Sequence, residues 1–253
     1  MDSRDKVLLP VDKILGLIES AIAKRTPFSL VRIGDGENLC MAQEAVLSQQ
    51  AIMREAWARA SATTRQKGVR LPDLKLRDTL LNAVRAADLV GIHPWDDRII
   101  LTESRLKRPL AERIFAHYKI KPRRLCNASI TRIFPQNRRF WTALKPARVL
   151  LVSRWAARLR PIVTAAPYHL TVAGCVPFDF YNDVPKVLKA AASMRGRFDV
   201  ALVSCGVSAL VLAVKLARQT GCVALDFGKA SQFMVEGKAG LNAPPSRFAP
   251  RSL

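Results

Sequence analysis

The sequence predicts an α/β fold built on a mostly parallel sheet, and three observations lead to this prediction. Apolar residues make up 49% of the 253 residues, and Val, Leu, Ile and Ala are spread along the chain, which is enough for a sizeable core. Short apolar segments alternate with amphipathic ones. One strand, helix and strand follow each other over residues 198–226, and such a unit joins parallel strands.

The first half of the chain opens with a helix over residues 11–24, where apolar residues recur at three- and four-residue spacings. Pro27 ends this pattern. A strand over 28–33 follows and stops at Gly34-Asp35-Gly36. Composition then predicts helices over 38–60 and 74–87. A short strand is expected over 88–92, and a basic helix over 103–118.

The second half contains four predicted strands and one clear helix. The strands are expected at 148–152, 169–173, 198–203 and 222–226, and the helix at 207–219 with Gly221 as its stop. Beyond residue 228 the chain has no periodicity. We therefore expect one domain over residues 1–228 and a loosely ordered basic tail over 229–253.

The charge balance points to anionic partners. Lys and Arg number 41 against 20 Asp and Glu, a formal net charge of +21. Residues 102–139 hold eleven of these cations and two acids. This segment predicts salt-sensitive attraction to anionic surfaces, although most of its cations also suit an ordinary solvated face. Nucleic acid, an acidic membrane face and a phosphorylated substrate all remain open on charge alone.

Cysteine usage and the N-terminus indicate a cytoplasmic protein. The five cysteines are widely spaced without a C-x-x-C pair, which argues against a zinc knuckle and a disulfide framework. The first six residues carry acids, unlike a secretory signal, and no apolar stretch approaches 18 residues. The basic surface would still permit peripheral contact with the inner face of a membrane.

The sharpest local signal is Asp35-Gly36-Glu37 at the end of the first long strand. In a turning segment, two carboxylates two positions apart can converge on one cation, and the flanking glycines allow a close backbone approach. Mg²⁺ and Mn²⁺ prefer such oxygen ligands together with substrate phosphates. An ordinary polar turn would have the same composition.

Three further parts of the sequence are candidates for contact with a ligand. Gly206 and Ser208 lie where an apolar strand meets a helix, and a helix start with a free hydroxyl can bind an anion, although Ser208 or Ser204 can equally be a plain helix cap. Arg132 lies among small polar residues and could hold a phosphate. Asp226 ends the last strand, where it can contact a ligand or cap the following turn.

Residues 28–229 resemble the GT-D fold glycosyltransferases of bacteria. The likeness is carried by Ser29 to Glu37, with its Asp-x-Glu motif, by Gly206 to Ala209, and by Leu225 to Gly228. Two positions depart from the family pattern: Val207-Ser208 replaces Pro-Thr, and Lys229 replaces a His. The net charge of +21 is not a family feature either.

The resemblance implies a Rossmann-like fold and hexosyl transfer from a nucleotide-sugar, often UDP-linked, to an acceptor hydroxyl on a glycan, glycoprotein or lipid-linked molecule. It implies that Asp35 and Glu37 are the catalytic residues and contact Mn²⁺ or Mg²⁺ and the diphosphate. We expect the donor to be bound by these two acids and by Arg32, Gly34, Gly36, Arg132, Gly206, Ser208 and Asp226. The alternatives are a basic nucleic-acid-binding protein, although no specific nucleic-acid motif is present, and a metal-dependent phosphate-ester hydrolase.

Overall fold

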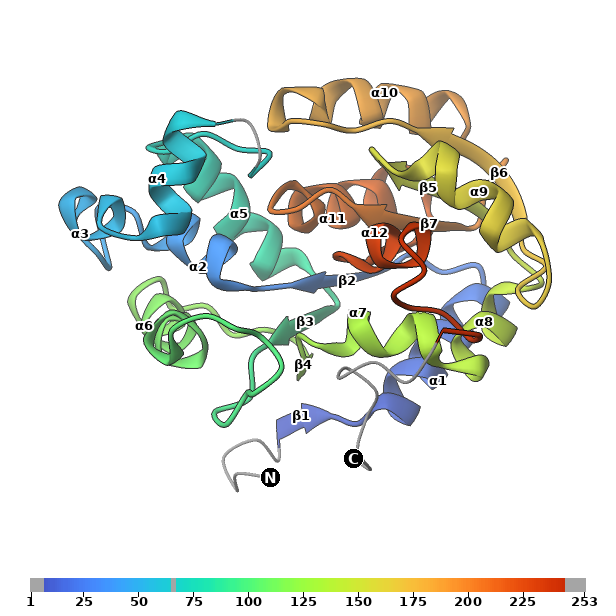
Figure 1. Ribbon diagram of the computed structural model, residues 1–253, viewed down its shortest axis with the longest axis horizontal. Coiled ribbons are helices and arrows are strands. Elements are labelled where there is room, and N and C mark those ends of the chain that lie inside the picture. Colours follow the sequence, from blue (N-terminus) through green and yellow to red (C-terminus); the bar gives the residue numbers. More distant parts are fainter. Residues whose placement is uncertain (1–6, 65–66, 244–253) are drawn as a thin grey trace.

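The computed structural model describes residues 7–64 and 67–243, and its described residues form one eight-stranded parallel sheet (Figure 1). The strand order is β1-β4-β3-β2-β8-β7-β5-β6, and every pairing is parallel. The predicted α/β class is therefore confirmed. The strands are β1 (Leu8–Leu9), β2 (Phe28–Arg32), β3 (Leu89–Ile92), β4 (Leu125–Asn127), β5 (Arg148–Ser153), β6 (Thr171–Val176), β7 (Val200–Ser204) and β8 (Val223–Asp226).

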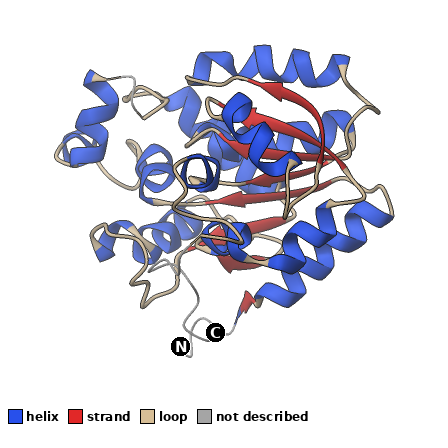
Figure 2. Ribbon diagram, turned by 45° about the vertical axis from the view of Figure 1, so that its right-hand side comes forward, coloured by secondary structure: helices blue, strands red, loops and turns tan. Residues whose placement is uncertain are grey.

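Helices cover both faces of the sheet, as parallel strands require (Figure 2). One apolar core lies under α2 (Asp35–Ala42), α5 (Leu74–Ala86), α6 (Arg108–His117), α10 (Val184–Ser193) and α11 (Ser208–Thr220). The second core lies under α1 (Val11–Ala23), α7 (Ile130–Ile133), α8 (Arg138–Leu144), α9 (Ala156–Thr164) and α12 (Ala230–Val235). The sheet thus separates two buried clusters.

The expected helix over 38–60 is three helices, namely α2, α3 (Gln49–Met53) and α4 (Ala56–Thr63). The chain leaves α2 at Gln43, whose side-chain amide donates to the Cys40 carbonyl and accepts from the Asp73 N–H. Glu44 has a left-handed φ of 67°, and Ser48 caps α3 through the Ala51 N–H. These local hydrogen bonds interrupt the helix, which composition alone predicts to be continuous.

Two other expected elements begin later than predicted. The basic helix over 103–118 is a 3₁₀ turn, η2 (Ser104–Leu106), followed by α6, because Lys107 leaves helical geometry and Pro109 opens the next helix. The strand expected at 169–173 begins at Thr171. His169 has φ of 54°, a left-handed conformation that an extended strand does not contain.

Ordered structure continues past residue 228, where we expected a loose tail. Helix α12 buries Ala230, Ser231 and Met234 against the sheet, and the Leu241 N–H donates to the Tyr168 hydroxyl at 3.0 Å. Three apolar or small residues at helical spacing are too short a pattern to separate from a tail by sequence. Residues 244–253 of the expected tail lie outside the described residues.

Within residues 7–64 and 67–243, no helix combines the length and the apolar character needed to cross a membrane.

Candidate functional site

The candidate site lies where β2 and β8 end side by side. The two strands pair in parallel, with Leu30 opposite Leu225. Helix α2, which follows β2, packs on one face of the sheet, whereas α12, which follows β8, packs on the other. Adjacent strands whose connections diverge in this way leave a crevice outside their carboxyl ends, and ligands of open α/β sheets bind there.

Arg32 and Asp226 form the centre of the site. Their side chains come from the ends of β2 and β8 and approach to 3.5 Å between Nε and Oδ2. Asp226 is buried and its Oδ1 accepts the Gly228 N–H at 2.8 Å. Burial raises the pKa of Asp226, and the nearby Arg32 charge only partly offsets this. Burial would lower the pKa of Arg32, but Asp226 and Glu37 outweigh it and keep the guanidinium charged.

Glu37 lies one turn into α2 and points back to the start of that helix. Its Oε2 accepts the Gly34 N–H at 2.9 Å, which is half of a capping box. The side chain is buried, and burial raises its pKa to about 7 although Arg32 acts in the opposite direction. Asp226 and Asp35 raise it further. Glu37 is therefore a carboxyl that titrates near neutral pH.

Asp35 is the more accessible acid of the motif. It occupies the first turn of α2 and is half-buried, whereas Glu37 and Asp226 are buried. An acid at this position is favourable because the helix dipole is positive there. The structure thus separates the two expected acids: Asp35 borders the crevice and Glu37 supports the turn.

The glycines make room for protein atoms in this structure. A Cβ on Gly36 would come within 2.5 Å of the Trp57 ring, and one on Gly34 within 2.9 Å of Glu37 Oε2. Gly228 has φ of 54°, and its Cβ would meet Thr131 Oγ1 at 2.9 Å and Arg32 Nη2 at 3.0 Å. Close packing around Arg32 and α2 therefore explains these glycines, in addition to any approach by a ligand.

Three more cations lie near this centre. Partial burial lowers the pKa of Lys229, and the charges of Arg132 and Lys67 lower it further, whereas Asp35 acts in the opposite direction. Arg132 lies 5.5 Å from the centre of the Phe233 ring, and Lys67 Nζ lies 5.9 Å from the Trp57 ring that covers Gly36. We call Arg32, Lys67, Arg132 and Lys229 the cation cluster.

Sequence reasoning expected Arg32 and Arg132 at the site and singled out Lys229 as a departure from the family pattern, but it did not name Lys67. Lys229 follows Asp226-Phe227-Gly228 directly, so its position beside a strand end was available as a signal. Lys67 comes from the connection between α4 and α5, and only the folded chain brings it next to Trp57.

The second expected motif lies one strand away, at the end of β7. Gly206 is exposed with φ of 56°. Ser208 begins α11 but is fully buried, and it does not cap that helix. Its Oγ has no hydrogen-bond partner among the described residues, whereas Ser204 Oγ pairs with Ser231 Oγ at 2.7 Å. Neither serine therefore caps α11, contrary to the capping interpretation.

The basic segment over 102–139 is described throughout, and five of its eleven cations form ion pairs. Arg105 pairs with Glu55 and Glu103, Lys107 with Asp97, Arg108 with Glu112, Arg123 with Asp88, and Arg139 with Asp12 and Glu19. Part of this charge therefore stabilises contacts within the fold. The remaining cations leave the predicted salt-sensitive attraction to anionic surfaces open to test.

The acids of the site could supply part of the coordination shell of a divalent cation. Among the described residues, no group of three or more His, Cys, Asp and Glu side chains is placed to hold a metal. Asp35 offers an accessible carboxylate, and Glu37 has a second oxygen, Oε1, beyond the one that accepts from Gly34. Mg²⁺ commonly takes one or two carboxylates and completes its shell with substrate phosphates and water.

Three comparisons place the chain among known proteins. A family model described as a GT-D fold-like domain matches residues 9–234. Two solved structures, both of the domain of unknown function 1792, align with a TM-score of 0.54 and 17% identity over 92% of this chain and 82% of theirs. One is described as having "a distinct glycosyltransferase fold". No curated protein matches the sequence. At this identity the two structures establish the fold.

Proposed function

Because the chain belongs to the family of GT-D fold-like domains, we propose that it is a glycosyltransferase. It transfers a hexose from a nucleotide-diphosphate sugar to an acceptor hydroxyl, and a UDP-linked sugar is the donor we expect. The acceptor belongs to a glycan, a glycoprotein or a lipid-linked molecule. The cytoplasm is the compartment we propose, with peripheral contact at the inner membrane face through the basic surface of residues 102–139.

The cation cluster is the observation that carries this proposal. Burial lowers the pKa of Lys229, and repulsion from Arg132, Lys67 and Arg32 lowers it further, although Asp35 acts in the opposite direction. An anion with two or more charges would relieve that repulsion, and a diphosphate is such an anion. Arg32 is fixed by Asp226, which suits a pre-oriented phosphate contact.

During transfer, the leaving diphosphate gains negative charge as the bond to the sugar breaks. Lys67, Lys229 and Arg132 would stabilise that charge without having to move into place. Asp35, with Glu37 beside it, would hold Mn²⁺ or Mg²⁺, and the ion would supply further neutralisation of the diphosphate. Glu37 also accepts the Gly34 N–H and so supports the turn that positions Asp35.

A ligand screen by thermal unfolding tests the proposal. A ligand that binds only the folded state adds roughly 2.7 kcal/mol at a hundredfold excess over Kd. In a chain of this size that raises the melting temperature by about 5 to 10 °C. We expect this shift with at least one of UDP-glucose, UDP-galactose, UDP-N-acetylglucosamine and their GDP- and dTDP-linked counterparts, and a smaller shift after Mn²⁺ is chelated.

Asp35→Asn is expected to lose most of the shift and the sugar transfer, whereas Asp78→Asn, on the exposed side of α5, serves as the matched control. A wild-type protein that responds to no nucleotide-sugar but binds DNA in a salt-dependent way would favour the nucleic-acid alternative. Hydrolysis of simple phosphate esters without sugar transfer would favour the hydrolase alternative.

A further inference from the structure

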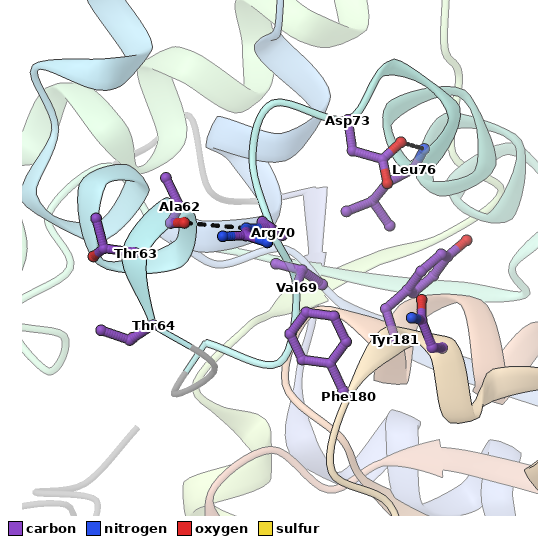
Figure 3. Close-up of a pocket in the computed structure, with 10 residues that line it drawn as sticks. Ala62, Thr63, Thr64, Val69, Arg70, Asp73, Leu76, Phe180 and Tyr181 are labelled. Carbon is purple, nitrogen blue, oxygen red and sulfur yellow. Dashed lines mark hydrogen bonds between the residues drawn. The ribbon is translucent and has the colours of Figure 1, made fainter.

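A second cavity lies beside the cation cluster and has no part in the site described above. It encloses about 430 Å³ between the end of α4, the segment before α5 and the 3₁₀ turn η4 (Tyr181–Asp183) (Figure 3). That volume falls in the range of small-molecule sites. Its lining consists of Ala62, Thr63, Thr64, Val69, Arg70, Asp73, Leu76, Phe180, Tyr181 and Asn182.

The lining combines aromatic side chains with polar and charged ones. Phe180 and Tyr181 approach from η4, opposite Val69 and Arg70 (Figure 3). Arg70 brings one positive charge and Asp73 one negative charge, so the cavity has no cation excess, unlike the cation cluster. This composition suits a neutral ligand with one apolar face and several hydroxyl groups, which is the chemistry of a sugar ring.

The connection between α4 and α5 joins this cavity to the cation cluster. Lys67 belongs to the cluster, and Val69 and Arg70, two and three residues later, line the cavity. Gly68, with φ of 73°, lies between them, and its carbonyl accepts the Tyr181 N–H at 2.8 Å. The short segment from Lys67 to Arg70 therefore contributes residues to both the cation cluster and the cavity.

We propose that this cavity binds a sugar unit of the acceptor. The inference rests on the proposed glycosyltransferase function and adds the acceptor's chemical class: a neutral carbohydrate that packs on Phe180 and Tyr181 and hydrogen-bonds to Arg70, Asp73 and Asn182. The cation cluster binds the donor, so the two substrates occupy neighbouring sites on either side of Gly68.

Ligand-observed NMR with free sugars tests the inference. The probes are glucose, galactose, N-acetylglucosamine, rhamnose, lactose and maltose, each added to the full-length protein with and without UDP. We expect saturation transfer to at least one of them. Arg70→Gln and Asn182→Ala both change exposed residues. Each should weaken sugar binding roughly tenfold, which corresponds to the loss of about one hydrogen bond to the ligand.

Arg85→Gln is the matched control, because Arg85 is an exposed arginine on α5 that bonds to Asn82 and the Tyr118 carbonyl. Its sugar binding should equal that of the wild type, and UDP should raise the melting temperature equally in all four proteins. If no sugar binds the wild type, the acceptor assignment is wrong. It is also wrong if Arg70→Gln loses the UDP response, and in that case the cavity binds the nucleoside. If UDP and all nucleotide-sugars fail while a sugar binds in the cavity, the transferase function fails and the cavity's ligand class stands.

Discussion

Two buried acid clusters at the same edge of the sheet differ in how well their charges are compensated. After β3, Asp97 accepts from Lys107 Nζ at 2.9 Å and approaches His93 Nδ1 to 3.5 Å. Burial alone would raise the pKa of Asp97, but His93 and Lys107 outweigh it and lower the pKa to about 2. Beside β2, by contrast, burial dominates and raises the pKa of Glu37 to about 7.

The difference separates a structural ion pair from a site prepared for a ligand. Asp97 is paired with the buried Lys107, so a protein cation balances its charge. Glu37 and Asp226 share the direct support of Arg32, while Lys67, Arg132 and Lys229 lie nearby. Acids with perturbed pKa values beside several cations are typical of functional sites.

The largest expected effect on stability is at the compensated cluster. Asp97→Asn leaves Lys107 buried without its carboxylate, and such a change typically costs about 3 to 5 kcal/mol of unfolding free energy. Urea unfolding should show this loss, while the folded variant still responds to the nucleotide-sugar. Asp97→Asn with Lys107→Met removes both charges and should recover part of the loss. If Asp97→Asn is as stable as the wild type, the comparison between the two clusters fails.

Glu37→Gln should act in the opposite direction. A carboxyl whose pKa rises from 4.5 to about 7 on folding binds its proton more tightly in the folded state, so stability is lost as pH rises through this window. Gln cannot ionise and can still accept from Gly34. In metal-free buffer the variant should match the wild type near pH 4 and exceed its unfolding free energy by up to about 3 kcal/mol at pH 8.

That gain in stability should come with a loss of sugar transfer, because only the ionised carboxylate can bind a cation.

Asp97 gives the reverse pH profile: its contribution to stability is present above its ordinary pKa of 3.8 and is lost as pH falls toward 2. A Glu37→Gln protein whose stability relative to wild type does not change between pH 4 and pH 8 would show that Glu37 is not strained by burial.

A smaller effect is expected from Gly228→Ala. The left-handed φ alone costs about 1 kcal/mol for a residue with a Cβ, and the added methyl would also press on Thr131 and Arg32. Gly196→Ala is the matched control, because Gly196 has φ of 76° with nothing within 4 Å of the new Cβ. Only Gly228→Ala should weaken donor binding as well, since it displaces Arg32. Equal melting temperatures and equal donor affinities for the two variants would contradict this.

Ser208→Ala should have the smallest effect. Its Oγ is buried and has no partner among the described residues, so removing it should change the unfolding free energy by less than about 1 kcal/mol. Ser208 remains a predicted donor contact, and calorimetric titration should show a weaker loss of donor affinity than a change in the cation cluster causes. Unchanged affinity would remove Ser208 from the site.

The sequence predicted the elements with long apolar or amphipathic patterns, including β2, α5, β3 and the unit β7-α11-β8. It missed β1 and β4, whose two and three residues are too short to show alternation. Arg32 and Asp226 were both expected at the site, but their contact depends on β2 pairing with β8, which local patterns do not encode. Lys67 was missed for the same reason, because its position beside Trp57 depends on the folding of the connection between α4 and α5.

The central claim is that the cation cluster binds the diphosphate of a nucleotide donor, and the ratio of UDP to UMP affinity isolates that contact from all contacts to the nucleoside. Isothermal titration of both nucleotides into wild type, Lys229→Gln and the exposed control Lys215→Gln on α11 measures it. Wild type and control should prefer UDP by roughly a hundredfold, and Lys229→Gln should reduce that preference about tenfold without changing UMP affinity. Equal affinity of the wild type for UDP and UMP, or an unchanged preference in Lys229→Gln, would contradict the account.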